Sequence, residues 1–133
     1  MGDRVSISFI QTHKFPNGRD VIRESVSLFH HWGGANFPNY ALQWLKNTKA
    51  EFKKDNLSTP ISRLEPEILI IQFLVDLSRN ERFRDYTHKD RLSHSIYLGK
   101  DSNDGDNSDN GHFVIDIDKM EIQNATSLET LFE

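Results

Sequence analysis

The chain has 133 residues, with 16 Lys and Arg against 20 Asp and Glu, a formal net charge of -4, and no cysteine. This length predicts a single domain over residues 1–133, and the lack of cysteine excludes a disulfide framework, Cys-ligated zinc, iron–sulfur clusters and thiol catalysis. The negative charge does not favour a general nucleic-acid-binding protein, whose contact surface is basic.

Alternating apolar and polar residues over 5–9 and 25–28 predict two half-buried strands. Between them, Asn17 and Gly18 form the strongest short hairpin signal, because both residues tolerate the positive φ of a type I′ turn. A two-residue turn at this point fixes the register of the two strands. The predicted pairs are Phe9 with Val26, Ile7 with Leu28 and Val5 with His30 on the apolar face, and Ser8 with Ser27, Ser6 with Phe29 and Arg4 with His31 on the other.

The middle of the chain has helical periodicity. An amphipathic helix is expected from about Pro38, and a second begins at Pro66, since proline suits the first turn of a helix. From Ile68 to Leu77 only two residues are polar. A helix that is apolar nearly all round is typical of a buried central element.

Strand-like alternation returns over 92–98 and 113–118, separated by the acidic loop 100–111 within a C-terminal hairpin. A capping box at 126–129 predicts a short closing helix. The resulting order is β-β-α-α-β-β-α. It predicts an α+β two-layer domain, with an antiparallel sheet and the helices packed on one face.

Several short segments of the sequence resemble segments of a group of small uncharacterised proteins from phages, archaea and bacteria. The matching segments are Asp3-Arg4 in the first strand, Phe29, the motif His31-Trp32-Gly33-Gly34, and the strand 114–118. Members usually have Ser where this chain has His30, and often a Gly-rich third strand where it has residues 92–96. The resemblance implies a fold and a focal site, and carries no established activity.

The first candidate site combines Asp3, Arg4 and His31. A carboxylate can fix the tautomer of a neighbouring imidazole, and a guanidinium can bind a carboxylate or phosphate through two hydrogen bonds. With Trp32 and the glycines Gly33 and Gly34 beside them, these residues could form a small anion pocket. The alternative is a structural polar cluster, in which Trp32 packs into the core and the glycines serve a sharp turn.

The second candidate is a calcium site in the acidic loop. Asp106, Ser108 and Asn110 match the first oxygen ligands of a calcium loop, but Ile117 stands where an EF-hand needs a bidentate Glu, so an EF-hand is excluded. The alternative is a solvated turn built from residues that suit turns. No histidine spacing indicates zinc, and His30, on the apolar face, is predicted to be buried.

A third segment, 79–91, interleaves basic and aromatic residues. Acidic residues within it reduce its net charge to +2, so a solvated helix end or a protein-contact edge is favoured over single-stranded nucleic acid.

Together these features predict a small non-enzymatic binding protein whose focal site is His31–Gly34, of phage or mobile-element type by resemblance. The alternative is a small hydrolase or nucleotide-processing enzyme with His31 as general base and Arg4 as anion clamp. A structural subunit, with an exposed apolar patch and a homo-oligomeric state, is a third class. We expect a partner protein or a small anionic ligand and no cofactor. With no membrane span or secretory signal in the sequence, we expect a cytoplasmic location.

Overall fold

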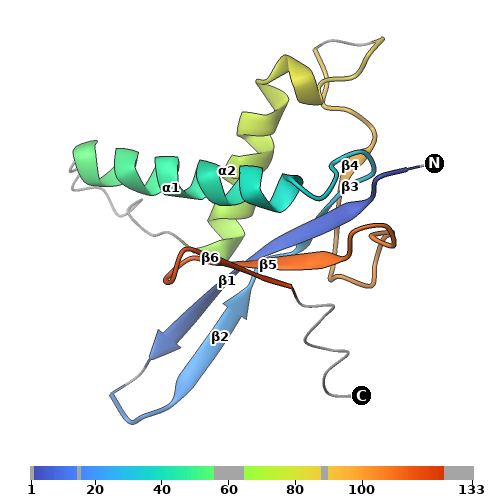
Figure 1. Ribbon diagram of the computed structural model, residues 1–133. Helices are drawn as coiled ribbons and strands as arrows, with labels where there is room; N and C mark the ends of the chain where they lie inside the picture. Colours follow the sequence, from blue (N-terminus) through green and yellow to red (C-terminus); the bar gives the residue numbers. More distant parts are fainter. Residues whose placement is uncertain (1, 15, 56–64, 88–89, 125–133) are drawn as a thin grey trace.

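The computed structural model describes residues 2–14, 16–55, 65–87 and 90–124, and has a mixed α+β fold with one six-stranded sheet (Figure 1). Three strands precede the helices and three follow them, where the sequence predicted two and two. The predicted helix at 126–129 lies outside the described residues. The elements are β1 (Val5–Lys14), β2 (Asp20–Glu24), β3 (Ser27–His30), α1 (Phe37–Asp55), α2 (Pro66–Ser78), the 3-10 helix η2 (Glu81–Phe83), β4 (Ile96–Gly99), β5 (His112–Asp116) and β6 (Glu121–Asn124).

The sheet is mixed rather than antiparallel. Its strand order is β4-β3-β1-β5-β6, with β2 paired to the outer half of β1, and β1 pairs with β5 in parallel. The predicted C-terminal hairpin is therefore wrong, because β4 and β5 lie on opposite sides of β1. The third predicted strand is also shorter than expected and begins at Ile96 rather than Leu92, which makes an isolated bridge to Arg84.

The register between β1 and the strands opposite it changes partway along. Val5, Ser6 and Ile7 pair with His30, Phe29 and Leu28 as predicted, but Ile10 pairs with Glu24 and Lys14 with Asp20. One extra residue is accommodated at Ser25 and Val26, which is a β-bulge. The predictions of a two-residue turn and of an inward-facing Val26 are therefore wrong, and the Val26 side chain is exposed.

Ser25 explains why the bulge forms there. Its hydroxyl accepts the buried Phe9 N–H at 3.0 Å, and its own N–H donates to the Phe9 carbonyl at 2.9 Å. The side chain replaces a missing ladder acceptor, so the irregular backbone leaves no unpaired donor at Phe9.

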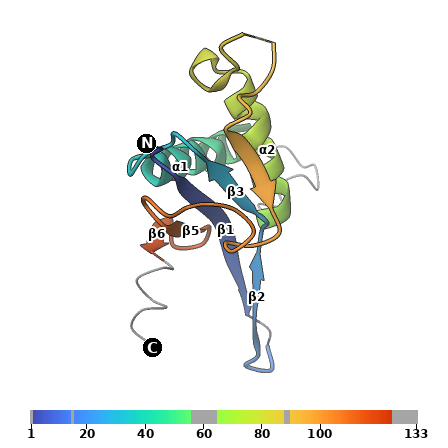
Figure 2. The ribbon, with the colours of Figure 1, turned by 90° about the vertical axis from the view of Figure 1, so that its right-hand side faces the viewer.

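Buried residues of both helices join Val5, Ile7 and Phe9 of β1 in one core cluster, and Trp44 of α1 packs against Phe9 with ring centroids 6.0 Å apart. Figures 1 and 2 show α1 over β5 and β6, and α2 on the opposite flank, towards β4. Phe73 of α2 is fully buried and meets Phe9 edge-on, with ring centroids 6.1 Å apart. Neither helix is long and apolar enough to cross a membrane, a finding that covers only the described residues.

The outer face of α2 differs from the sequence prediction of a helix buried all round. Pro66, Leu69, Ile70, Phe73 and Leu77 are buried. The outward stripe is nevertheless apolar and exposed, and consists of Ile68, Ile71 and Val75.

The acidic loop lies on the other face of the sheet. Phe29 of β3 is fully buried there and stacks on Tyr97 of β4, with ring centroids 5.1 Å apart. A Cβ built on Gly105 would lie 2.8 Å from the Phe29 ring and 2.9 Å from that of Tyr97. Loop 100–111 thus packs so closely against the sheet that only a glycine fits at this contact.

Candidate functional site

The N-terminal segment and the His31–Gly34 turn are joined through the backbone. The Asp3 N–H donates to the His31 carbonyl at 2.9 Å, and the Gly34 N–H donates to the Asp3 carbonyl at 2.9 Å. The Asn110 side chain donates to the Asp3 carboxylate at 2.8 Å and to the Arg4 carbonyl at 3.0 Å. The two candidate regions singled out in the sequence, residues 3–4 with 31–34 and the acidic loop, therefore form one site.

Arg4 is bound by carboxylates of this same chain. Its Nε lies 3.2 Å from Asp106 Oδ2 and its Nη1 lies 3.3 Å from Asp109 Oδ2, while its backbone N–H donates to Asp109 at 2.9 Å. A guanidinium holds carboxylates well because its donors form a rigid fork. Two of the three guanidinium nitrogens, Nε and Nη1, are thus directed at the acidic loop.

Trp32 is the most prominent aromatic group of the site. It is 59% exposed, and its ring meets the half-buried His31 ring edge-on at 4.5 Å. The His31 ring makes no hydrogen bond to another described residue. The alternative in which Trp32 packs into the core does not describe this arrangement, although the glycines do serve a sharp turn.

Gly33 and Gly34 are each required by local packing. A Cβ on Gly33 would lie 2.6 Å from Val5 Cγ1 and 2.9 Å from His30 Nδ1. Gly34 has φ of +76°, which side-chain-bearing residues rarely adopt, and a Cβ there would lie 3.0 Å from Asp3 Oδ2. The two glycines let the chain turn tightly against β1, and this turn presents Trp32.

The three calcium candidates lie in the loop but make other contacts. Asp106 accepts the Ser108 N–H at 3.0 Å and pairs with Arg4, while Asn110 directs its amide at Asp3. Hydrogen bonds from Ser108, followed by the charge of Arg4, lower the pKa of Asp106 below its ordinary value. Within the described part of the chain, no group of three or more His, Asp or Glu side chains is placed to hold a metal ion.

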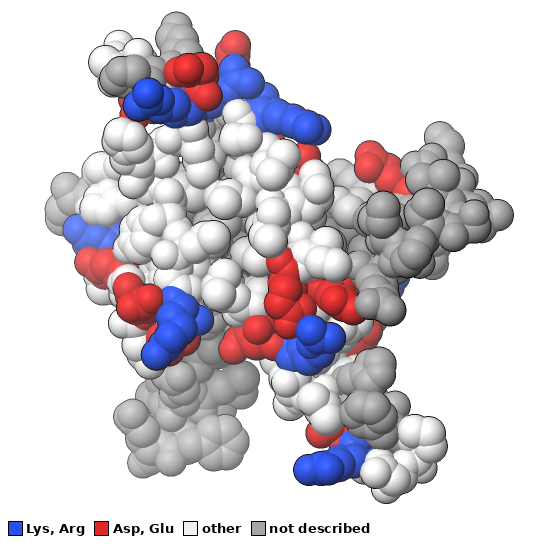
Figure 3. Space-filling view, turned by 180° about the vertical axis from the view of Figure 1, so that it is seen from behind, with Lys and Arg blue, Asp and Glu red and all other residues white. Residues whose placement is uncertain are grey.

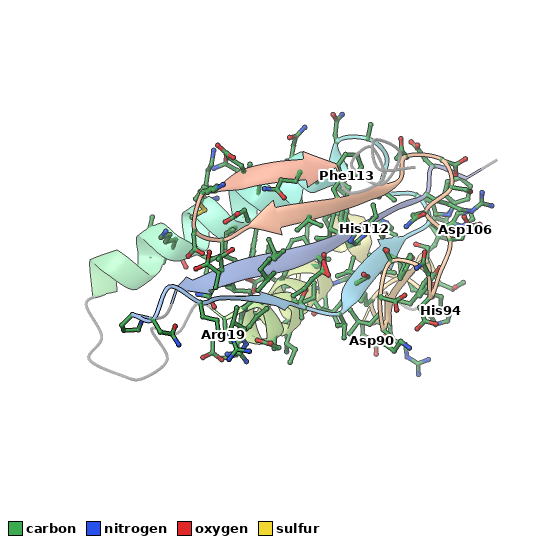
Figure 4. All side chains as sticks on the ribbon, turned by 90° about the horizontal axis from the view of Figure 1, so that it is seen from below. Arg19, Asp90, His94, Asp106, His112 and Phe113 are labelled. Atoms are coloured by element: carbon green, nitrogen blue, oxygen red, sulfur yellow. The ribbon has the colours of Figure 1, made fainter. Side chains whose placement is uncertain are left out.

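The sequence analysis missed a row of buried polar side chains beside this site, which are joined by hydrogen bonds and are called the hydrogen-bond chain below. His112 is 5% exposed, and its Nδ1 lies 2.7 Å from Ser6 Oγ and its Nε2 3.1 Å from Ser8 Oγ. Asn107 donates to Ser6 Oγ at 2.8 Å, and Ser8 donates to the Glu24 carboxylate at 3.1 Å. Figure 4 views the sheet from below, with His112 over the strands and Asp106 at one end of the sheet.

The Glu24 end of this hydrogen-bond chain indicates its direction. Ser8 donates its one hydroxyl proton to the Glu24 carboxylate, so Nε2–H of His112 donates to Ser8. In a neutral imidazole Nδ1 is then the acceptor, and it accepts from Ser6. The imidazole is neutral, and burial lowers its pKa to about 4. These residues fix the acidic loop to the sheet. Ser6 and Ser8 are fully buried, so neither presents a nucleophile at the surface.

His30 is buried, as predicted from its place on the apolar face. Its ring packs against Phe37 at 4.9 Å and Phe83 at 5.7 Å. Its Nδ1 is a buried atom without a hydrogen-bond partner. Burial, followed by the charges of Arg82 and His31, lowers the pKa of His30 to about 4.

The basic and aromatic segment after α2 is partly structural. Arg84 donates to the Ser78 carbonyl at 2.9 Å and to the Arg79 carbonyl at 3.2 Å, which satisfies acceptors at the end of α2. Arg82 lies over the Phe83 ring at 5.3 Å. Tyr86 is 95% exposed. A surface pocket at this end is lined by Glu81, Arg82, Arg84, Asp85 and Tyr86.

Comparisons of this chain with protein-family models, with curated proteins and with solved structures find no match. The site is therefore interpreted from its own geometry.

Proposed function

We propose that this chain is a small non-enzymatic protein that binds another protein, with Trp32 as the central contact. The observation that carries the proposal is the 59% exposure of Trp32 on a turn that packs closely against the chain at the two glycines that follow it, Gly33 and Gly34. Tryptophan is enriched among the few residues that dominate binding energy at protein interfaces. A rigid anchor also loses little conformational entropy on binding.

The charges around Trp32 suggest the chemistry of the partner. Asp3, Asp106 and Asp109 outnumber Arg4, which leaves two net negative charges in the cluster that the Asp3 backbone joins to the Trp32 turn. Arg and Lys side chains can pair with such carboxylates and can also lie on the face of a tryptophan ring. We therefore expect a partner segment that contains basic residues.

The alternative, a hydrolase with His31 as base and Arg4 as anion clamp, receives less support. Arg4 would have to leave Asp106 and Asp109, at 3.2 and 3.3 Å, before it could bind a substrate anion. Breaking charge-assisted hydrogen bonds of this kind opposes anion binding.

Selection of random peptides on the wild-type protein tests the proposal. We expect enrichment of peptides rich in Arg and Lys that lose at least about tenfold in affinity for Trp32→Ala, as for a contact of about 1.4 kcal/mol or more. Tyr86→Ala is the matched control, because Tyr86 is an exposed aromatic residue outside the His31–Gly34 turn, and it should leave these affinities unchanged.

Two results would overturn the proposal. One is a set of selected peptides that bind Trp32→Ala as tightly as wild type. The other is turnover of a chromogenic phosphate or carboxylate ester that His31→Ala abolishes, which would support the enzymatic alternative.

A further inference from the structure

The sequence contains two Asn-Gly pairs, Asn17-Gly18 and Asn110-Gly111. At such a pair the backbone nitrogen of the glycine can attack Cγ of the asparagine, because glycine has no side chain to hinder the approach. The attack expels ammonia and closes a succinimide ring, and water then opens this ring to aspartate or isoaspartate. A neutral amide is thereby replaced by a carboxylate, a covalent change that alters the local electrostatics.

The first pair is open to solvent. It lies in the turn between β1 and β2, where both residues are exposed, and a Cβ built on Gly18 would meet nothing within 4 Å beyond its chain neighbours. Figures 1 and 3 show the β1–β2 hairpin projecting from the body of the molecule, away from the acidic loop. Asn17 therefore reports how fast an exposed Asn-Gly pair of this chain reacts.

The second pair is held by the closed acidic loop. The Asn110 side-chain amide donates to the Asp3 carboxylate at 2.8 Å and to the Arg4 carbonyl at 3.0 Å. The Gly111 N–H donates to the Asn107 carbonyl at 2.7 Å. Attack requires the Gly111 nitrogen to turn from Asn107 towards Cγ of Asn110, so these hydrogen bonds must break first. The same contacts that close the loop therefore oppose the reaction.

We propose that Asn110-Gly111 is a latent deamidation site, which reacts only when the acidic loop opens and whose reaction then keeps the loop open. A carboxylate has no proton to donate, so in place of the amide it faces the Asp3 carboxylate and the Arg4 carbonyl without a hydrogen bond. It also adds a negative charge beside Asp3, and like charges at this distance repel.

Isoaspartate has a second effect, because it lengthens the backbone by one methylene group between Asn110 and Gly111. The Gly111 carbonyl accepts the Ser6 N–H at 3.2 Å, and this insertion displaces it from β1. Either product therefore turns a reversible opening of the loop into an irreversible one. The inference concerns closure of the loop and does not depend on the function proposed for Trp32.

Peptide mapping by mass spectrometry, after incubation at neutral pH and physiological temperature, compares the two pairs within one molecule. In the folded wild type we expect Asn110 to deamidate at least about tenfold more slowly than Asn17, because its reaction awaits a local opening. In urea-unfolded protein the two rates should become similar. Gly105→Ala places a Cβ 2.8 Å from the Phe29 ring, so it should loosen the loop and accelerate Asn110 without changing Asn17.

Hydrogen exchange tests whether the product holds the loop open. Asn110→Asp reproduces one product, and the Gly111 amide should lose protection in it. Asn17→Asp is the matched control and should leave that amide protected. Equal deamidation of Asn110 and Asn17 in the folded wild type overturns the shielding, as do rates that stay tenfold apart in urea or an unchanged Asn110 rate in Gly105→Ala. Full protection of the Gly111 amide in Asn110→Asp overturns the irreversible opening.

Discussion

Mild acid should destabilise this protein, because two histidines are buried in their neutral form. Burial lowers the pKa of His30 and of His112 from 6.5 to about 4. Between these values the unfolded chain binds protons that the folded chain does not. Stability is therefore complete above about pH 6.5 and falls as the pH drops towards 4. Allowing for the small exposed fraction of each ring, we expect a loss of about 2 kcal/mol per histidine.

Urea denaturation between about pH 8 and pH 4 measures this loss. His30→Leu should flatten the pH dependence by about half, and it removes a buried nitrogen that has no partner, so it should cost less than about 1 kcal/mol at neutral pH. An identical acid profile for wild type and His30→Leu would contradict the assignment of a neutral buried His30.

Truncation of Phe29 should detach the acidic loop from the sheet. Phe29 is fully buried on the face opposite the helices, between Tyr97 and Gly105. Phe29→Ala removes the apolar surface on which the loop packs, and we expect a loss of about 3–4 kcal/mol in unfolding free energy. The loop should then open before the rest of the molecule unfolds.

Hydrogen exchange distinguishes this from general destabilisation. The Asn110 and Gly111 amides donate to the Arg4 and Asn107 carbonyls at 2.9 and 2.7 Å, and they should lose protection first in Phe29→Ala. Phe73→Ala is the matched control, since Phe73 is equally buried but on the helix side. It should reduce stability without selective exchange in the loop. Retained protection of the loop amides in Phe29→Ala would contradict a loop held by this packing.

The local parts of the fold were predictable because local rules determine them. Pairing of Val5 with His30 and of Ile7 with Leu28 was predicted from the Asn17-Gly18 turn together with hydrophobic alternation, as was the place of His30 on the buried face. The outer register was wrong because the sequence pattern does not reveal that the Ser25 side chain replaces a backbone acceptor. A five-residue connection between Lys14 and Asp20 and the later bulge offset each other, so the inner pairs were still correct.

Non-local pairing determines the rest, and the sequence pattern does not encode it. The parallel pairing of β1 with β5 brings Ser6 beside His112, so the buried chain through Ser8 could not be recognised from spacing. The same topology moves the acidic loop onto Arg4. The sequence grouped Asp3, Arg4 and His31 as one candidate site, but the carboxylates that bind Arg4 were assigned to a separate one.

The most direct test of the central claim, that this protein acts by binding through Trp32, uses its two tryptophans. Trp32 is exposed, whereas Trp44 packs against Phe73 and donates from Nε1 to Asp76 at 2.7 Å. Fluorotryptophan labelling gives one ¹⁹F resonance for each, assigned with Trp32→Phe. On titration with a selected basic peptide, the Trp32 resonance should shift and that of Trp44 should not. A saturated complex in which the Trp32 resonance is unchanged would contradict this account.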